Sequence, residues 1–421
     1  MRKVNFFVRC IAVPAVLAAA ALVSGSHANA QQEKVLHSFM NNGVDGALPN
    51  TNLVFDKAGN LYGAADEGGR FNRGVVFELK ASPEGVWSES ILHNFGDGSR
   101  DGMNPYGNIL LDASGNIYGT ASYGGLNGGG TAFELIPQAA GGWGEVILHN
   151  FTTRGSDGEY PDTGLIADSQ GNLYGGTLRG GLAANCGGFG CGIVFELVRD
   201  AGGKWTEKIL HDFSGVNGDG NGPQYNLAFD PSGNLYGTTL SGGSFGGGMV
   251  FELTPTAKGL WVETKVHSFE GGSGDGYYPN AGLTLDASGN LYGTTSLGGA
   301  YNHGTVFKLM PGIGGEWATK VLYSFGASAT DGVDPMAGVI FGAVGNLYGN
   351  TSGGGTSGYG TVFELAPNGD GTWTEIILHS FTGTDGNYPA ASLAVDGRGN
   401  IYGTTEEGGT NLVGTVFEII P

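Results

Sequence analysis

Short apolar runs, separated by turns rich in glycine and aspartate, follow one another along most of the chain. In residues 282–325, apolar and β-branched residues form four such runs, over 283–285, 291–295, 304–309 and 317–325. Valine, threonine and aromatic residues favour strands, whereas aspartate and glycine favour the turns between them. No window has the 3.6-residue apolar spacing of a helix. The pattern therefore predicts four consecutive β-strands in this segment.

The same four-strand pattern recurs seven times. A Gly-Asn-Leu/Ile-Tyr-Gly motif introduces the second strand of every unit. The first glycines of these motifs are Gly59, Gly115, Gly171, Gly233, Gly289, Gly345 and Gly399. A repeat of about 56 residues with four strands is typical of a β-propeller blade. The sequence therefore predicts an all-β, seven-bladed propeller with four-stranded blades.

The order of the strands predicts how the ring closes. After the first 30 residues the chain begins with a fourth strand, which ends at Phe39, and it finishes with a third strand over 415–419. These two partial units complete one blade, so the N-terminal strand should be the outer strand of the last blade. Such closure removes the free sheet edges that an open row of units would expose.

The first 30 residues have the pattern of a secretory signal peptide. Three basic residues accompany an apolar run over 11–23, and a small-x-small cleavage site ends at Ala30. The run is shorter than the roughly 20 residues that a membrane span needs, although an uncleaved anchor remains the alternative. We expect export to the periplasm or the extracellular space. Removal of 1–30 would leave a single propeller domain over 31–421, with no membrane span.

The charge of the chain argues against one class of partner, and its cysteine content bears on the compartment in which it folds. Without its first 30 residues the chain has 16 basic and 39 acidic side chains, a net charge of −23. Such a surface repels phosphate backbones, which argues against a nucleic acid partner. Cys186 and Cys191 flank a short, glycine-rich segment. In an oxidising compartment this spacing predicts a disulfide, with free thiols or a metal site as alternatives.

The motifs follow one order in every unit. Leu-His-Ser-Phe precedes Asp-Gly-x-x-Pro, then Asp-x-x-Gly-Asn-Leu-Tyr-Gly-Thr-Thr, Gly-Gly and Gly-Thr-Val-Phe-Glu-Leu. Over residues 34–419 this order resembles the GloVer repeat of exported bacterial proteins. The resemblance implies a secreted repeat protein of undetermined activity, often with a C-terminal anchoring segment, and none follows Ile419 here. It implies no catalytic residues.

One aspartate per unit lies in the Asp-Gly-x-x-Pro motif, between the fourth strand of one blade and the first strand of the next. Seven carboxylates would then ring one face of the propeller. They are Asp45, Asp101, Asp157, Asp219, Asp275, Asp331 and Asp385. Such a ring would suit calcium, but capping of each aspartate's own turn is the favoured interpretation. No other cofactor is expected.

Two further columns are interpreted as structural. The aspartate of Asp-x-x-Gly-Asn is expected to cap its turn. Six histidines lie in fourth strands, with Tyr323 in the seventh place. They are His37, His93, His149, His211, His267 and His379. With one histidine on the outer strand of each blade, we expect them to lie far apart and to serve in packing.

A single functional site must come from positions where the units differ. The pair of residues before Gly-Gly varies most, and blades one and seven carry Asp66-Glu67 and Glu406-Glu407. These blades are neighbours in a closed ring, so four carboxylates should meet where the second-to-third and fourth-to-first loops share a face. The predicted ligand-binding residues are Asp66, Glu67, Arg70, Tyr301, His303, Glu406 and Glu407.

Three functions agree with this sequence. An exported, non-enzymatic binding or scaffold propeller would hold carbohydrate, protein or envelope partners at its loop face, since no nucleophile elbow, zinc motif or cofactor fingerprint is present. A carbohydrate-active enzyme, either a lyase or a glycoside hydrolase, would instead use the acidic cluster of blades one and seven. A purely structural envelope protein would have no dedicated ligand. We expect a monomer in each case.

Overall fold

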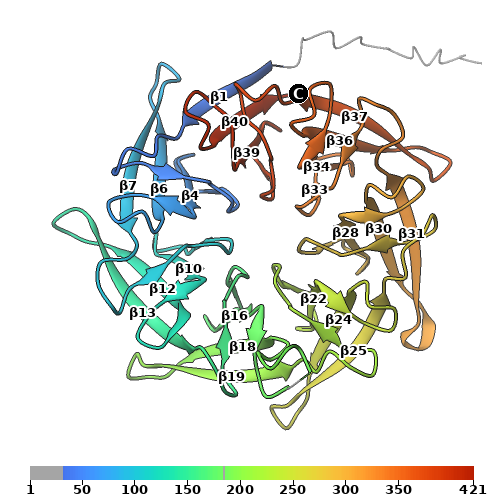
Figure 1. The fold of residues 1–421 in the computed structure, drawn as a ribbon, viewed down its shortest axis with the longest axis horizontal. Helices are drawn as coiled ribbons and strands as arrows, with labels where there is room; N and C mark the ends of the chain where they lie inside the picture. Colours follow the sequence, from blue (N-terminus) through green and yellow to red (C-terminus); the bar gives the residue numbers. More distant parts are fainter. Residues whose placement is uncertain (1–31, 184) are drawn as a thin grey trace, which may run out of the picture. The chain divides into compact units, whose positions relative to one another are not determined.

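The computed structural model describes residues 32–183 and 185–421, so the predicted signal peptide lies outside the described residues. In this part of the chain, strands make up all regular structure except one 3₁₀ helix, η1 (Ile313–Gly315). Figure 1 shows seven sheets arranged around a common centre. This arrangement confirms the predicted seven-bladed propeller.

Blade one shows the plan of the others. Its strands are β3 (Val54–Phe55), β4 (Leu61–Ala65), β6 (Val75–Ala81) and β7 (Trp87–Asn94), paired antiparallel in that order. The labels β4, β6 and β7 follow one another outward from the centre in Figure 1. In blades one to six the outer strand is the one that begins at a tryptophan.

The equivalent strands of the next five blades follow the same order. They are β9 (Leu110–Leu111), β10 (Ile117–Ala121), β12 (Gly128–Pro137) and β13 (Trp143–Thr152) in blade two; β15 (Ile166–Ala167), β16 (Leu173–Gly176), β18 (Ile193–Arg199) and β19 (Trp205–Asp212) in blade three; β21 (Ala228–Phe229), β22 (Leu235–Thr239), β24 (Met249–Pro255) and β25 (Trp261–Ser268) in blade four; β27 (Thr284–Leu285), β28 (Leu291–Thr295), β30 (Thr305–Pro311) and β31 (Trp317–Ser324) in blade five; and β33 (Ile340–Phe341), β34 (Leu347–Thr351), β36 (Thr361–Pro367) and β37 (Trp373–Ser380) in blade six.

Blade seven is built from both ends of the chain. It consists of β38 (Ala394–Val395), β39 (Ile401–Thr405), β40 (Thr415–Ile420) and, outermost, β1 (Gln32–Ser38). Strand β1 pairs antiparallel with β40, from Gln32 opposite Ile420 to Ser38 opposite Thr415. Figure 1 shows the blue β1 beside the red β40. The predicted closure by the N-terminal strand is confirmed.

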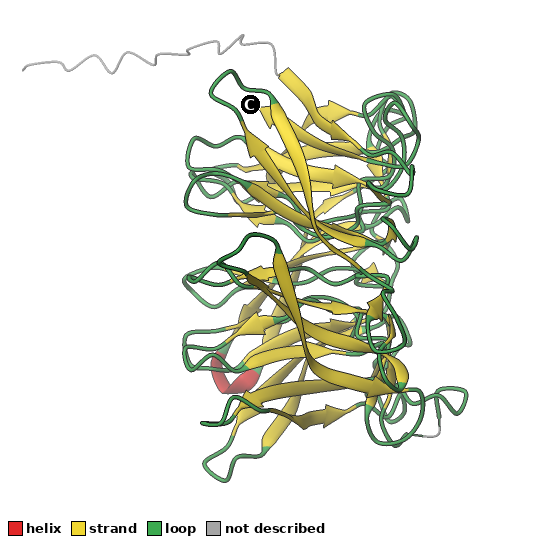
Figure 2. Cartoon of the chain, turned by 90° about the vertical axis from the view of Figure 1, so that its left-hand side faces the viewer, coloured by secondary structure: helices red, strands yellow, loops and turns green. Residues whose placement is uncertain are grey.

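Short β-ladders of two residues connect the fourth-to-first loop with the second-to-third loop of the following blade. In each of blades one to six, the Asp-Gly segment of the fourth-to-first loop pairs with the residues before or within Gly-Gly. The pairs are β2 (Gly46–Ala47) with β5 (Glu67–Gly68), β8 (Gly102–Met103) with β11 (Tyr123–Gly124), β14 (Gly158–Glu159) with β17 (Arg179–Gly180), β20 (Gly220–Asn221) with β23 (Ser241–Gly242), β26 (Gly276–Tyr277) with β29 (Leu297–Gly298), and β32 (Gly332–Val333) with β35 (Gly353–Gly354). The two loop types therefore share a face. Figure 2 shows loops on two opposite sides of the ring, with η1 in a third-to-fourth loop on one of them.

The hydrophobic core is divided among the junctions between blades. Phe39 at the end of β1 packs edge-on against Phe77 of blade one, with ring centroids 5.2 Å apart, and an equivalent phenylalanine pair occurs at every junction. Gly63 lies opposite Phe77 in the sheet, and a Cβ there would come within 2.6 Å of the ring. The final glycine of the Gly-Asn-Leu/Ile-Tyr-Gly motif therefore leaves room for the core phenylalanine.

The predicted disulfide is present. Cys186 and Cys191 are bonded, with their Cα atoms 5.3 Å apart, in the loop between β16 and β18. Cys191 is fully buried in the core between blades three and four. Among the described residues, no helix has the length and apolar character needed to span a membrane.

Candidate ligand-binding site

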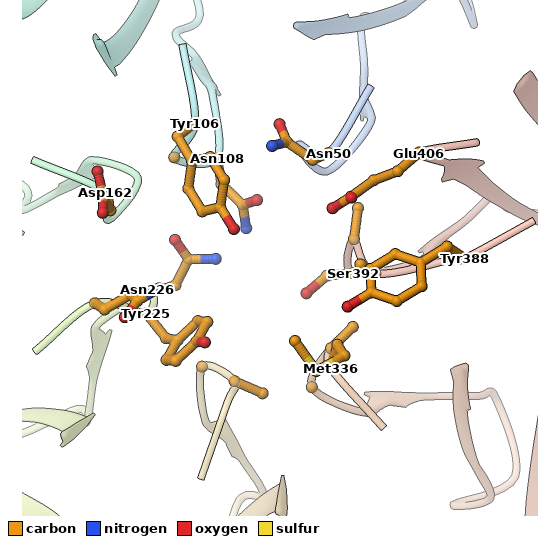
Figure 3. Close-up of a pocket in the computed structure, with 18 residues that line it drawn as sticks. Asn50, Tyr106, Asn108, Asp162, Tyr225, Asn226, Met336, Tyr388, Ser392 and Glu406 are labelled. Carbon is orange, nitrogen blue, oxygen red and sulfur yellow. The ribbon is translucent and has the colours of Figure 1, made fainter. Parts of the chain in front are cut away.

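A cavity of about 150 Å³ lies at the centre of the ring, since residues from all seven blades line it. Figure 3 shows side chains from several blades directed toward this space. Most of the lining comes from the segments that follow the proline of Asp-Gly-x-x-Pro. The cavity therefore belongs to the loop face that we predicted to hold a ligand.

The residue directly after that proline varies among the blades, with asparagine in two of them and a different residue in each of the other five. This column consists of Asn50, Tyr106, Asp162, Gln224, Asn280, Met336 and Ala390. All of its members except Asn280 line the cavity. The proline ends the loop at a fixed place, so the next residue lines the cavity in six of the seven units. This column was not predicted from the sequence, although its variability next to a proline shared by all seven units was the available signal.

Three acceptor atoms at the cavity lack partners. Asn50 Oδ1, Asp162 Oδ1 and Gln224 Oε1 are buried and have no hydrogen-bond partner in the described part of the chain. Buried polar atoms in native proteins are nearly always hydrogen-bonded, to protein or to another molecule. The arrangement therefore suits a bound molecule that donates hydrogen bonds.

Tyrosine rings supply flat surfaces around these acceptors. Tyr106, Tyr225 and Tyr388 line the cavity from blades two, four and seven. Figure 3 shows the three rings around the central space. Burial raises the pKa values of Tyr225 and Tyr388, so both phenols stay protonated near neutral pH. Each ring thus combines an apolar surface with a hydroxyl group.

Two carboxyl groups that line the cavity have pKa values above the usual range. Burial raises the pKa of Glu406 to about 7, and the charges of Asp66 and Glu407 add to this shift. Burial likewise raises the pKa of Asp162 to about 7. Asp66, which neighbours the cavity, has a pKa raised to about 6 by burial and by Glu67. Near neutral pH these carboxyls can therefore donate as well as accept protons.

The structure places the predicted ligand-binding residues in different surroundings. Glu406 lines the cavity, and Asp66, Glu67 and Glu407 influence the same acidic sector through their charges. Glu67 is half-buried in the β2–β5 ladder, and Glu407 is exposed and accepts a hydrogen bond from Asn387 Nδ2 at 2.8 Å.

The other three lie outside the cavity lining. Arg70 is exposed and its guanidinium lies over the ring of Phe71. Tyr301 is half-exposed, and His303 Nδ1 lies 4.0 Å from a carboxylate oxygen of Asp334. A role for Arg70, Tyr301 and His303 in binding stays a prediction.

The aspartates of Asp-Gly-x-x-Pro do not line the cavity. Asp45 instead accepts hydrogen bonds from the backbone N–H groups of Met40 and Gly46, at 2.8 and 2.7 Å, which confirms turn capping at this position. Its carboxylate also lies 3.2 Å from Nε2 of His37. The interpretation of the fourth-strand histidines as packing residues was therefore incomplete, because they also pair with these aspartates.

The second aspartate column caps its turns as expected. Asp56 Oδ1 accepts the backbone N–H groups of Ala58 and Asn60, and Oδ2 accepts the side-chain amide of Asn60 and the hydroxyl of Tyr62. These contacts leave the carboxylate occupied within its own turn. This column therefore contributes to folding of the repeat.

Solved structures share the fold at low identity. A candidate 6-phosphogluconolactonase from Bacteroides uniformis matches with 13% identity and a TM-score of 0.50, covering 77% of this chain and 84% of that chain. The extracellular domain of a candidate hybrid two-component system from B. thetaiotaomicron matches with 13% identity and a TM-score of 0.53, covering 92% of this chain and 39% of that chain. Likeness at this identity shows the propeller fold alone. No curated protein sequence matches the chain.

The repeat itself is the specific match. The model of the Gloeobacter/Verrucomicrobia repeat matches residues 22–189 and 181–417, which together span nearly all of the propeller. The resemblance noted from the motif order is thereby confirmed. This chain belongs to the Gloeobacter/Verrucomicrobia repeat family.

Proposed function

We propose that this protein is an exported, non-enzymatic binding propeller that holds a small polyhydroxylated ligand, such as one terminal sugar unit, in its central cavity. The observation that carries the proposal is the set of unpartnered acceptors Asn50 Oδ1, Asp162 Oδ1 and Gln224 Oε1 beside three tyrosine rings. Sugar hydroxyls donate hydrogen bonds, and the C–H face of a sugar ring packs on aromatic surfaces. Acceptors beside aromatic rings suit both properties.

The size and charge of the cavity limit the ligand. Its volume of about 150 Å³ is below the roughly 300–1,000 Å³ of pockets for drug-sized molecules, so one ring fits and a longer chain would extend outward. None of the residues that line the cavity is basic, and two are acidic. Phosphorylated and other strongly anionic ligands are therefore disfavoured.

The proposed location follows from the disulfide and the charge. The Cys186–Cys191 bond persists in oxidising compartments, and a net charge of −20 for the whole chain favours solubility outside the cell. Both features support export to the periplasm or the extracellular space.

The test is a screen of neutral and acidic glycans against the 31–421 chain, followed by titration calorimetry with the best binder. We expect Gln224→Ala to weaken binding about 3- to 10-fold, because one hydrogen bond is lost. Asn280→Ala is the matched control, since Asn280 occupies the same column but does not line the cavity. Equal affinity in the two variants, or no glycan bound at all, would contradict the proposal.

A carbohydrate-active enzyme is the second candidate. The raised pKa values of Asp162 and Glu406 give this cavity two groups able to act as general acids near pH 7. If a bound glycan is cleaved, release of reducing or unsaturated ends should stop in Glu406→Gln while binding persists. Full turnover in that variant would exclude Glu406 from the reaction.

A further inference from the structure

Each junction between blades brings together side chains from three positions that lie far apart in the repeat. One residue lies on the outer strand of a blade, an aspartate follows in the next loop, and a third residue lies on the outer strand of the next blade. At five junctions the three are His, Asp and Glu. These clusters are His37, Asp45 and Glu89; His93, Asp101 and Glu145; His149, Asp157 and Glu207; His211, Asp219 and Glu263; and His379, Asp385 and Glu33.

The junction between blades one and two shows three atoms without partners. His93 Nε2 lies 3.5 Å from Asp101 Oδ1 and 3.6 Å from Glu145 Oε1. All three atoms are buried and lack hydrogen-bond partners in the described part of the chain. The Asp101 side chain is only 5% exposed, so water does not readily satisfy it. Three potential ligand atoms thus face one another in a buried space.

At this junction the separations exceed those of direct hydrogen bonds and fit a shared cation. In three other clusters the histidine Nε2 already lies 3.2, 3.3 and 3.1 Å from its aspartate, within hydrogen-bonding range. N–H···O bonds are usually 2.7–3.2 Å long. Two ligands of a tetrahedral zinc ion, each about 2.0–2.2 Å from the metal, lie about 3.3–3.6 Å apart. The junction between blades three and four is similar, with His211 Nε2 3.6 Å from Asp219 Oδ1 and 3.9 Å from Glu263 Oε2. Small side-chain movements would bring these atoms to one metal.

The ligand atoms and their surroundings favour a transition metal. One imidazole nitrogen and two carboxylates suit Zn²⁺ and its neighbours, whereas Ca²⁺ takes oxygen ligands. Asp101 is held in place by the backbone N–H of Asp97, which donates to Oδ2 at 2.8 Å. Such outer contacts orient carboxylate ligands at metal sites.

We propose that the five His–Asp–Glu clusters each bind one divalent transition metal ion, with zinc as the probe, and that the metal links the outer strands of adjacent blades. Three protein ligands leave a fourth position for water. One of the five sites uses Glu33 of β1, so metal would also fasten the strand that closes the ring. The aspartate column would then serve separate sites at the rim of the ring, not one central crown.

The remaining two junctions show what replaces the cluster. Thr319 stands where other blades have Glu, and its hydroxyl lies 3.1 Å from His267 Nδ1. Tyr323 stands where other blades have His, and its hydroxyl lies 3.1 Å from Asp331 Oδ2 and 2.9 Å from Glu375 Oε2. At the first of these junctions His267 Nε2 also lies 3.1 Å from Asp275 Oδ1, and at the second the Tyr323 hydroxyl joins the two carboxylates. These two junctions are natural controls within the same chain.

The competing arrangement is a proton shared by the two carboxyl groups. At the junction of blades seven and one, burial and the charge of Asp45 raise the pKa of Glu89 to about 9, so Glu89 can stay protonated and donate to Asp45. A shared proton links only the two carboxyls. The count of bound metal ions distinguishes the two arrangements.

The experiment uses the untagged 31–421 chain, stripped with EDTA, incubated with zinc and passed through a desalting column before elemental analysis. We expect about five zinc ions per chain. Glu145→Gln should lower the count by one, and Thr319→Glu should raise it by one because it completes a sixth cluster. Glu375→Gln, at the tyrosine junction, should leave the count unchanged.

The gain in Thr319→Glu keeps the test decisive even if a loss variant folds poorly. Zinc should also raise the melting temperature of the stripped wild-type chain. A zinc count near zero in the wild type, or one that moves in neither Glu145→Gln nor Thr319→Glu, would overturn the proposal.

Discussion

Deletion of residues 31–40 from the chain that starts at residue 31 is expected to lower the melting temperature by on the order of 10 °C or more, or to abolish cooperative unfolding. Strand β1 supplies the outer strand of blade seven, and Phe39 and Leu36 are buried in the core between blades seven and one. Fully burying such side chains contributes about 1.5–3 kcal/mol each. Val35 contributes less than its sequence suggested, because it is only half-buried.

The loss is large relative to the stability of the whole domain. An ordinary domain is stable by about 5–15 kcal/mol, and the deletion also removes the backbone pairing of β1 and bares the edge of β40. Further contacts disappear with it, including hydrogen bonds from Thr410 N–H to Ser38 Oγ and from Asn411 Nδ2 to the carbonyl of Phe39. An exposed edge should promote association, visible by size-exclusion chromatography.

Point variants on β1 distinguish the loss of stability caused by losing a buried side chain from the loss caused by shortening the chain. Phe39→Ala should cost about 3–5 kcal/mol through loss of a fully buried ring. Lys34→Ala is the matched control, because Lys34 is exposed on β1 and makes only a surface hydrogen bond to the carbonyl of Gly85. Calorimetry should show a clear drop for the first and little change for the second. An unaltered melting curve for the deletion would contradict closure by β1.

The fold could be predicted because each repeat carries its own strand and turn signals. Gly63 and Phe77 illustrate this, since both recur in every unit and the structure pairs them across neighbouring strands. Closure was predictable for the same reason: a lone fourth strand and a lone third strand must complete one blade. Local pattern and repeat order were sufficient for both conclusions.

The cavity and the His–Asp–Glu clusters were harder to predict from the sequence, because both depend on how neighbouring blades face each other. Of the acidic residues selected before Gly-Gly, only Glu406 lines the cavity, although the ladders place Glu67 and Glu407 at equivalent positions. The column that starts at Asn50 was overlooked because its members range from amides and an aspartate to tyrosine, methionine and alanine. His93, Asp101 and Glu145 were visible as separate columns, but their meeting depends on the register between adjacent outer strands.

The second large effect is expected from pH: without bound metal, the protein should be most stable near pH 5 and should lose on the order of 5 °C in melting temperature by pH 8.5. Burial raises the pKa values of Glu145 and Glu207 at the junctions to about 7, as it does for Asp162 and Glu406 at the cavity. Their ordinary values lie near 4. The native state therefore holds more protons than the unfolded chain between about pH 4.5 and 7.

Linkage fixes the sign of the effect. Where the native state binds more protons than the unfolded chain, the free energy of unfolding falls as pH rises. The stabilisation from these carboxyls is therefore fully present below their pKa in the unfolded chain. It is lost as pH rises through about 7, their pKa in the native state. The aspartates act in the opposite direction at lower pH. Burial tends to raise the pKa of Asp385, but hydrogen bonds from His379 and Thr382 outweigh it and lower the value, so its contribution is lost only in acid. The optimum should therefore lie between the two ranges.

Melting curves in EDTA from pH 4 to 9 provide the measurement. Glu89→Gln should flatten the alkaline fall, because the amide cannot ionise in the buried site where burial and Asp45 raise the pKa of Glu89 to about 9. Glu316→Gln, at an exposed position beside η1, should leave the profile unchanged. A wild-type profile that rises from pH 5 to 8.5 would show that these carboxyls are ionised in the native ring. The Glu89→Gln variant reports on a junction carboxyl, whereas the raised pKa values of Asp162 and Glu406 at the cavity still contribute to the alkaline fall in that variant.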